Sequence, residues 1–219
     1  MKKFNSLDVA ALLVWLLPPV YLLYIWPSLP ASVPVHYGIN GAPDRYGSKN
    51  EFLTSQFLLM GVSLGIYLLL KFLPAIDPKK YVKYGEPTFQ KLALGLVIFL
   101  SALSILIAYS AIIHGFKAGK MILPVVGLLF AFIGNIMYNI KPNYFAGVRT
   151  PWTLEDPENW KSTHRLAGKL WFIGGLVITV AVLLLPNKAG FVTFMSLMVV
   201  LVLVPVVYSF VYFKKHQPK

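Results

Sequence analysis

Six long apolar stretches constrain this chain more than any other feature of its sequence. Each is long enough to cross a bilayer, since a membrane-spanning helix needs about 20 apolar residues. The stretches lack the alternating polarity of barrel strands, and backbone groups in lipid must be satisfied within their own segment, so each is predicted to be a helix. The stretches cover residues 7–26, 52–73, 92–113, 121–140, 168–185 and 191–213.

The composition supports this interpretation. Hydrophobic residues make up 57% of the chain and charged residues 13%, whereas a soluble domain has about 25% charged residues. This composition excludes an ordinary soluble domain and a disordered protein. It contains no cysteine, which excludes disulfides, thiolate metal sites and cysteine nucleophiles. The predicted fold class is an all-α membrane protein, a bundle of six transmembrane helices.

The distribution of positive charge predicts how the bundle is oriented. Fifteen Lys and Arg residues belong to the termini, the second connection and the fourth connection, against five in the other connections. Because Lys and Arg are enriched in cytoplasmic segments, both termini are expected in the cytoplasm. The net charge of +12 is then explained by topology and by anionic headgroups. We therefore expect membrane lipids as partners, and no direct binding of nucleic acid.

Two connections are too long and too patterned to serve only as links. They divide the chain into an N-terminal three-span region, residues 1–113, with an outer loop at 27–51, and a second three-span region, residues 114–219. The second region contains the cytoplasmic loop 141–169, which we call the signature loop.

The outer loop is predicted to form a small extracellular hairpin that caps the bundle. Pro34 favours extended backbone, and Asn40-Gly41 is a strong turn signal because both residues tolerate positive φ. His36 and Asp44 are expected to meet across this hairpin, beside Arg45. One His and one Asp are too few ligands for a metal site, so we expect an ordered turn and no metal.

The signature loop is predicted to lead into an amphipathic helix at the inner membrane surface. Asp156 followed by Pro157 is typical of a helix start, with Thr153 as a rival cap. Trp160 and His164 share one face of this helix with Trp171. A neighbouring basic stripe is expected to bind anionic headgroups, or an acidic protein partner; it consists of Lys161, Arg165 and Lys169.

Three further features of the second half invite a structural and a functional interpretation. The guanidinium of Arg149 needs carboxylate or carbonyl partners, and Trp152 is placed to cover it by a cation–π contact. The pair either staples the loop to the bundle or contacts a partner. Asn135 lies inside the fourth stretch and is expected to face other helices, as a link between helices or on a substrate path. Gly61 and Gly65 form a GxxxG pattern, which allows close helix approach but is common by chance.

The signature loop strongly resembles the SdpI family of bacterial membrane proteins. The resemblance rests on Gly134-Asn135, on Asn143 to Leu154 with the run Gly147-Val148-Arg149-Thr150-Pro151-Trp152-Thr153-Leu154, on Trp160, and on His164 to Lys169. The outer loop is similar to a small domain of unknown function found at the N-terminal end of such proteins. The resemblance implies a six-span protein of the bacterial plasma membrane that protects its producer against a secreted toxic peptide. It further implies that the protein binds an autorepressor at the membrane.

The resemblance also indicates which residues to test. Candidate partner-binding residues in the cytoplasmic loop are Asn143, Gly147, Arg149, Thr150, Pro151, Trp152, Trp160, His164 and Arg165. Candidate toxin-facing residues in the outer loop are Pro34, His36, Asn40, Gly41, Asp44 and Arg45.

Two other function classes compete with immunity. A transporter of small molecules or peptides is the alternative, but transporters usually carry charge inside the membrane, and here Asp8 and Lys71 lie near the ends of spans. An enzyme would need a nucleophile–base pair or a metal cluster at one depth. The four histidines are scattered and no HExxH motif occurs, so we expect neither an enzyme nor a cofactor.

Overall fold

The computed structural model describes residues 4–76, 86–113, 116 and 118–216. Its elements, in chain order, are α1 (Ser6–Ile25), the 3-10 turn η1 (Trp26–Ser28), β1 (Ser32–Tyr37), β2 (Pro43–Ser48), α2 (Lys49–Ile76), α3 (Glu86–Ile112), α4 (Ala118–Met137), α5 (Pro151–Glu155), α6 (Pro157–Leu184) and α7 (Asn187–His216). Lysines 2, 3, 79, 80, 83, 117 and 219, which entered the charge count above, lie outside the described residues.

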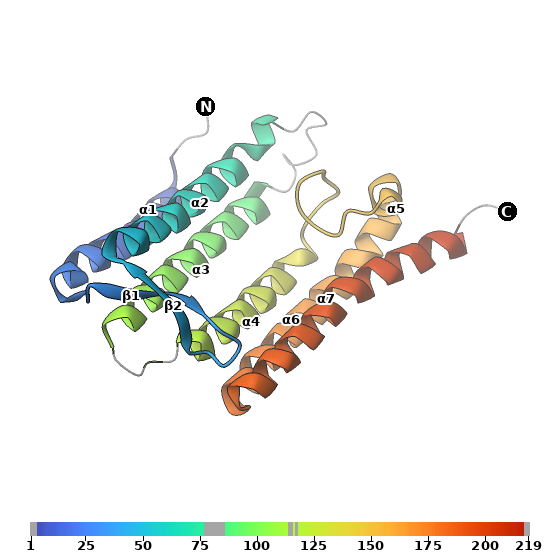
Figure 1. Ribbon diagram of the computed structural model, residues 1–219. Helices are drawn as coiled ribbons and strands as arrows, with labels where there is room; N and C mark the ends of the chain where they lie inside the picture. Colours follow the sequence, from blue (N-terminus) through green and yellow to red (C-terminus); the bar gives the residue numbers. More distant parts are fainter. Residues whose placement is uncertain (1–3, 77–85, 114–115, 117, 217–219) are drawn as a thin grey trace.

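The long helices run alternately up and down between two ends of a bundle (Figure 1). The end that carries β1 and β2 is called the hairpin end. The other, where α1 begins and α7 ends, also carries α5 and is called the signature end. Six of the described helices are long and apolar enough to cross a membrane, which confirms the predicted fold class.

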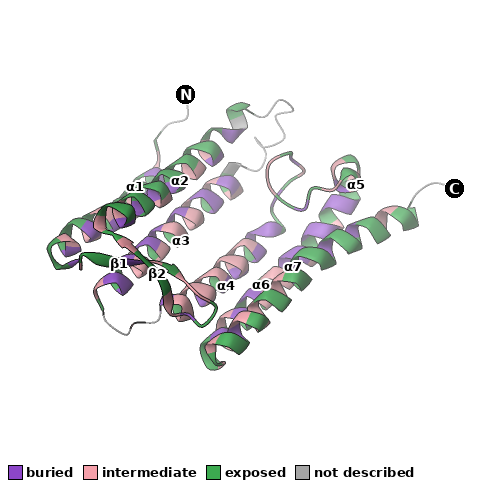
Figure 2. Cartoon of the chain, viewed as in Figure 1, coloured by how far each residue is buried: buried purple, intermediate pink, exposed green. Residues whose placement is uncertain are grey.

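Large apolar side chains on the outside of the helices fit a lipid environment. Leu23 and Leu184 are 76% and 80% exposed, and exposed residues cover the outer face of α7 (Figure 2). A water-soluble protein rarely leaves such wide apolar faces open. The protein is therefore a multi-pass membrane protein.

The helices pack as two groups that meet along α3 and α4. In the first group, α1 and α2 each pack mainly on α3, and in the second, α6 lies between α4 and α7. A cluster of buried apolar side chains from α2, α3 and α4 joins the groups, with Leu73, Phe89 and Ile136 among its members. The predicted division near residue 113 falls between α3 and α4 and stays a prediction.

The closest helix contact is that of α4 with α6, and glycines make it possible. A Cβ added to Gly134 would lie 2.3 Å from the backbone nitrogen of Phe172, and one added to Gly175 would lie 2.4 Å from the nitrogen of Ala131. Small residues permit this approach of two backbones in a membrane. The GxxxG pattern at Gly61 and Gly65 does not do so, because a Cβ at either would meet nothing within 4 Å.

The predicted amphipathic helix and the fifth span are one continuous helix, α6. The capping carboxylate of Asp156 accepts from the amide of Glu158 at 2.8 Å, as predicted, but the helix then continues unbroken from Pro157 to Leu184. Its 28 residues are about 42 Å long, which exceeds a hydrocarbon core of about 30 Å. The expected amphipathic helix is thus the first part of a span, and its aromatic face is buried under the loop rather than lying on lipid.

The hairpin is an antiparallel pair in which Tyr37 opposes Pro43. Its five-residue tip turns at Gly41, whose φ is +73°, a conformation that glycine adopts readily. The tip rests on the second helix group: a Cβ added to Gly119 of α4 would lie 2.5 Å from the Cα of Gly41. The side-chain amide of Asn187, at the start of α7, donates to the carbonyl of Asn40 at 2.5 Å.

Candidate functional site

Asn143 shapes the first turn of the signature loop from inside. Its side chain is 2% exposed. The amide nitrogen donates to the carbonyls of Lys141 and Ala146, at 2.8 and 3.0 Å. The amide oxygen accepts from the backbone of Phe145 and Ala146, both at 2.7 Å. Four bonds from one buried amide explain why a short polar side chain is needed here.

Gly147 and His164 form the tightest point of the loop. Gly147 has a φ of +116°, and a Cβ there would lie 2.2 Å from Nε2 of His164. This ring nitrogen accepts from the backbone N–H of Val148 at 3.1 Å, while Nδ1 lies 2.8 Å from the carbonyl of Trp160. A backbone N–H only donates and a carbonyl only accepts, so the hydrogen bonds select a neutral ring protonated at Nδ1.

Trp160 completes this buried anchor. Its indole is 2% exposed and stacks on the ring of His164, with centroids 4.0 Å apart. The indole N–H donates to the carbonyl of Ile140 at 2.9 Å. Two residues one helical turn apart on α6 therefore hold both ends of the segment 140–148.

A short helix follows the anchor. Thr150 caps α5 in a reciprocal pair with Thr153, and Pro151 occupies the first helical position, where its missing N–H costs nothing. The hydroxyl of Thr153 also donates to the carbonyl of Val148 at 2.8 Å. Thr153, which the sequence suggested as a helix cap, is thus the partner of the true cap, Thr150. The sequence did not predict that Thr150 caps a helix.

Trp152 fastens α5 to α7. Its indole N–H donates to the hydroxyl of Ser209 at 2.6 Å, and its rings pack on Phe210 and Phe213. The amide of Asn159, on α6, donates to the carbonyl of Ser209 at 3.0 Å. Ser209 and Asn159 were not singled out from the sequence. The signal for Ser209 was a small hydroxyl side chain near the cytoplasmic end of the predicted last span.

Arg149 points outward from this fastened loop. It is exposed, and its guanidinium donates to the carbonyl of Tyr144, which fits the predicted need for a carbonyl partner. The predicted cation–π cover is wrong, because Trp152 packs on α7 instead. The structure thus combines both interpretations: Trp152 staples the loop, and Arg149 stays available at the surface.

Arg165 lies on the outer face of α6, one residue beyond the buried His164. Its guanidinium lies 5.4 Å from the centre of the Tyr138 ring and donates to the Tyr138 hydroxyl at 3.4 Å. This hydrogen bond, together with the charge of Arg165, lowers the pKa of Tyr138. The expectation that Asn135 faces other helices is wrong: Asn135 is exposed on the same surface, because Gly134, its neighbour in the helix, takes the position against α6.

At the hairpin end, the predicted meeting of His36 and Asp44 is confirmed. His36 Nδ1 lies 2.5 Å from an Asp44 carboxylate oxygen, and Arg45 pairs with Glu51 at 2.8 Å. Among the described residues, no group of three or more His, Asp or Glu is arranged to hold a metal ion.

Two hollows adjoin the hairpin tip. One of about 140 Å³ lies between the tip and the starts of α4 and α7, with Ile39, Leu123 and Phe191 in its wall. The other, about 800 Å³ and more open, is lined partly by His36, Asp44 and Lys188. The tip thus offers an apolar recess with a charged rim. Pro34 lies on the pairing strand, opposite Tyr46.

Tyr37 ties the hairpin to the first helix group. Its hydroxyl lies 2.5 Å from the hydroxyl of Ser110 on α3. Burial raises the pKa of Tyr37, so the phenol is neutral near pH 7. The hairpin therefore contacts both helix groups, through Tyr37 on one side and through Asn40 and Gly41 on the other.

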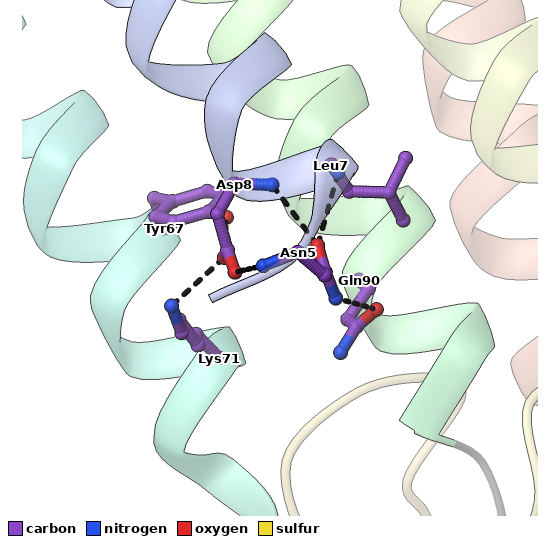
Figure 3. Close-up of polar contacts among 6 residues, drawn as sticks. All are labelled: Asn5, Leu7, Asp8, Tyr67, Lys71 and Gln90. Atoms are coloured by element: carbon purple, nitrogen blue, oxygen red, sulfur yellow. Dashed lines mark hydrogen bonds and ion pairs between the residues drawn. The ribbon is translucent and has the colours of Figure 1, made fainter. Parts of the chain in front are cut away.

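A second polar cluster lies near the start of α1, where α1, α2 and α3 meet (Figure 3). Lys71 of α2 lies 2.8 Å from the carboxylate of Asp8, and both side chains are largely buried. The hydroxyl of Tyr67 also donates to Asp8, and the backbone of Asn5 donates to it at 2.8 Å. The sequence marked Asp8 and Lys71 only as charges near span ends; the structure makes them one ion pair.

Comparison with known proteins finds matches for two separate parts of the chain. Residues 139–212 match the SdpI/YfhL protein family, and residues 13–61 match a domain of unknown function, DUF1648. The chain is 36% identical over 91 residues to "Immunity protein SdpI" of Bacillus subtilis (strain 168), a match over 41% of this chain and 43% of that protein. It is 44% identical over 45 residues, 20% of this chain and 22% of the relative, to an uncharacterized protein of Archaeoglobus fulgidus. The chain thus matches less than half the length of either relative, and no solved structure matches it.

Proposed function

From the premise that this is an SdpI-type protein, with the family region at residues 139–212, we propose that it is a bacterial plasma-membrane immunity protein. It gives resistance to a secreted antimicrobial peptide, which binds at the hairpin end. The relative that shares 36% identity carries the name of an immunity protein.

The observation that carries the proposal is the recess at the hairpin tip. An amphipathic peptide needs an apolar pocket for one face and polar groups for the other. The recess supplies Ile39 and Phe191 in its wall, and the adjoining hollow supplies His36, Asp44 and Lys188. The hairpin end faces outward in this proposal, as the Lys and Arg count predicts.

The same geometry supports a role in signalling. The hairpin tip rests on the starts of α4 and α7. At the other end, α4 ends at Met137, just before the signature loop, and α7 contacts that loop through Ser209. A peptide that binds the tip differently in two arrangements of these helices would shift their equilibrium. The cytoplasmic receiver is a repressor that contacts exposed Arg149 and the capped helix α5. This contact with a repressor extends the proposal from immunity to signalling.

A survival assay tests the immunity function. The protein is expressed in a bacterium sensitive to the family's peptide toxin, with membrane levels checked by blot. Wild type and Arg149→Ala are expected to protect, whereas Phe191→Ala and His36→Ala are expected to protect less. Tyr46→Ala, an exposed residue on β2 outside the recess, is the matched control. Full protection by Phe191→Ala and His36→Ala would place toxin capture elsewhere.

The orientation has its own test, made simple because the chain has no cysteine. Single cysteines at Ile39 and at Glu155, both exposed, are labelled in intact cells with a membrane-impermeant thiol reagent. Labelling at residue 39 alone supports the proposed orientation, and labelling at residue 155 alone overturns it.

One observation favours the transporter alternative. The ion pair of Asp8 and Lys71 is buried within the helix bundle, and ionisable groups in spans often mark transport paths. Uptake and efflux in vesicles, compared between wild type and the Asp8→Asn variant, separate the two functions. Flux that depends on Asp8, without toxin protection by the wild type, would favour transport.

A further inference from the structure

A groove at the signature end lies between α4 and α6, away from the proposed toxin site. Its volume is about 360 Å³, and it is lined by Gly134, Asn135, Tyr138, Arg165, Gly168, Lys169 and Phe172. The two glycines let the backbones of α4 and α6 approach closely, since a Cβ on Gly168 would lie 3.0 Å from the carbonyl of Gly134. The two glycines form the floor of the groove, and the longer side chains around them form its walls.

The polar groups of the groove favour an anion. Arg165 and Lys169 lie one helical turn apart on α6 and are exposed. Among the described residues, no carboxylate lies within ion-pair distance of either. Lys161 and Lys141 add to the positive field at the Tyr138 hydroxyl. Arginine and lysine side by side, with a phenol and an amide at the rim, match the oxygens of a phosphodiester.

The position of the groove indicates where the anion comes from. Immediately beyond Phe172, the outer face of α6 is apolar and open: Phe172 is 42% exposed, Ile173 61% and Leu176 42%. The charged residues of α6 precede this surface, and Lys169 is the last of them before the helix ends. The groove therefore lies where hydrocarbon gives way to headgroups, with an apolar track leading from it into the bilayer.

We propose that this groove binds one anionic phospholipid, with its phosphodiester on Arg165 and Lys169 and an acyl chain along Phe172 and Ile173. Asn135 and Tyr138 donate to the remaining headgroup oxygens. Basic residues are attracted to an anionic membrane in general, and that attraction requires neither a groove nor the side chains that α4 contributes. The site proposed here needs both, and its occupant is a lipid rather than free phosphate.

The test counts and titrates lipid on the purified full-length protein. Native mass spectrometry in detergent, with added phosphatidylglycerol or phosphatidylcholine, gives the number of lipids bound and their affinity. Wild type is expected to hold one phosphatidylglycerol at least tenfold more tightly than phosphatidylcholine. Arg165→Gln with Lys169→Gln is expected to lose at least tenfold in that affinity. The matched control, Lys214→Gln with Lys215→Gln on α7, removes the same charge elsewhere and is expected to lose less than twofold.

A neutral variant separates a built site from charge alone. Asn135→Phe keeps every cation and fills the groove from an exposed position, so it is expected to weaken phosphatidylglycerol binding at least threefold without unfolding the protein, as circular dichroism would confirm. Equal losses in the two double variants, or unchanged affinity in Asn135→Phe, would overturn the proposal. Competition by inorganic phosphate at millimolar concentration would likewise overturn it, by identifying an ion site in place of a lipid site.

Discussion

The contact between Gly147 and His164 yields a sharp prediction for the substitution Gly147→Ala. The new methyl group would lie 2.2 Å from Nε2 of His164, and real side-chain contacts are never this short. The backbone at residue 147 cannot relieve it easily, because its φ of +116° is one that L-residues rarely adopt. We therefore expect the ring of His164 to be displaced from the backbone N–H of Val148.

Two costs follow from this displacement. Holding a non-glycine residue in such a backbone conformation costs about 1–3 kcal/mol. Leaving the buried N–H of Val148 without an acceptor costs about 1–3 kcal/mol more. The sum of about 2–6 kcal/mol is a large share of an ordinary stability of about 5–15 kcal/mol. The measurement is the free energy of unfolding in mild detergent, followed by tryptophan fluorescence, since Trp160 stacks on the affected ring.

A double-mutant cycle with His164→Ala separates the two costs. His164→Ala is itself destabilising, because it removes both ring hydrogen bonds. In that background Gly147→Ala no longer meets the ring, so only the backbone cost of about 1–3 kcal/mol remains. Gly61→Ala is the matched control: a Cβ there meets nothing within 4 Å, and helix propensity favours alanine by about 1 kcal/mol. Equal costs of Gly147→Ala in the two backgrounds, or no cost in either, would refute the proposed clash.

Three further predictions concern the polar contacts on either side of this anchor. Lys71→Met leaves the buried carboxylate of Asp8 without its cation and should cost about 3–5 kcal/mol in unfolding free energy, most of it recovered when Asp8→Asn is added; equal stability of the two variants would contradict this. Ser209→Ala removes the acceptor of the Trp152 indole and should cost about 1–3 kcal/mol, with a shift in tryptophan emission as the check. Asn143→Ala removes four loop hydrogen bonds, so limited proteolysis should cut the signature loop faster than in wild type, and an unchanged cutting rate would count against the role of this amide.

The features that the sequence determined are local ones. Six spans followed from the length of apolar runs, because a bilayer imposes one thickness on every helix that crosses it. The start of α6 followed from Asp156 and Pro157, whose capping chemistry acts within three residues. The hairpin turn at Asn40-Gly41 followed in the same way from the positive φ that these residues tolerate.

The contacts that the tertiary structure decided join residues far apart in the chain. The carboxylate of Asp8 meets the ammonium of Lys71, and Trp152 finds Ser209, 57 residues later. Whether Asn135 or Gly134 faces α6 depends on how α4 is rotated about its axis. The sequence does not indicate this rotation, because almost every residue of the span is apolar. Apolar length fixes that a helix crosses the membrane, but every face of such a helix is compatible with lipid. The choice of the packed face therefore fell to the close approach of small residues and to hydrogen bonds, which only the assembled bundle brings together.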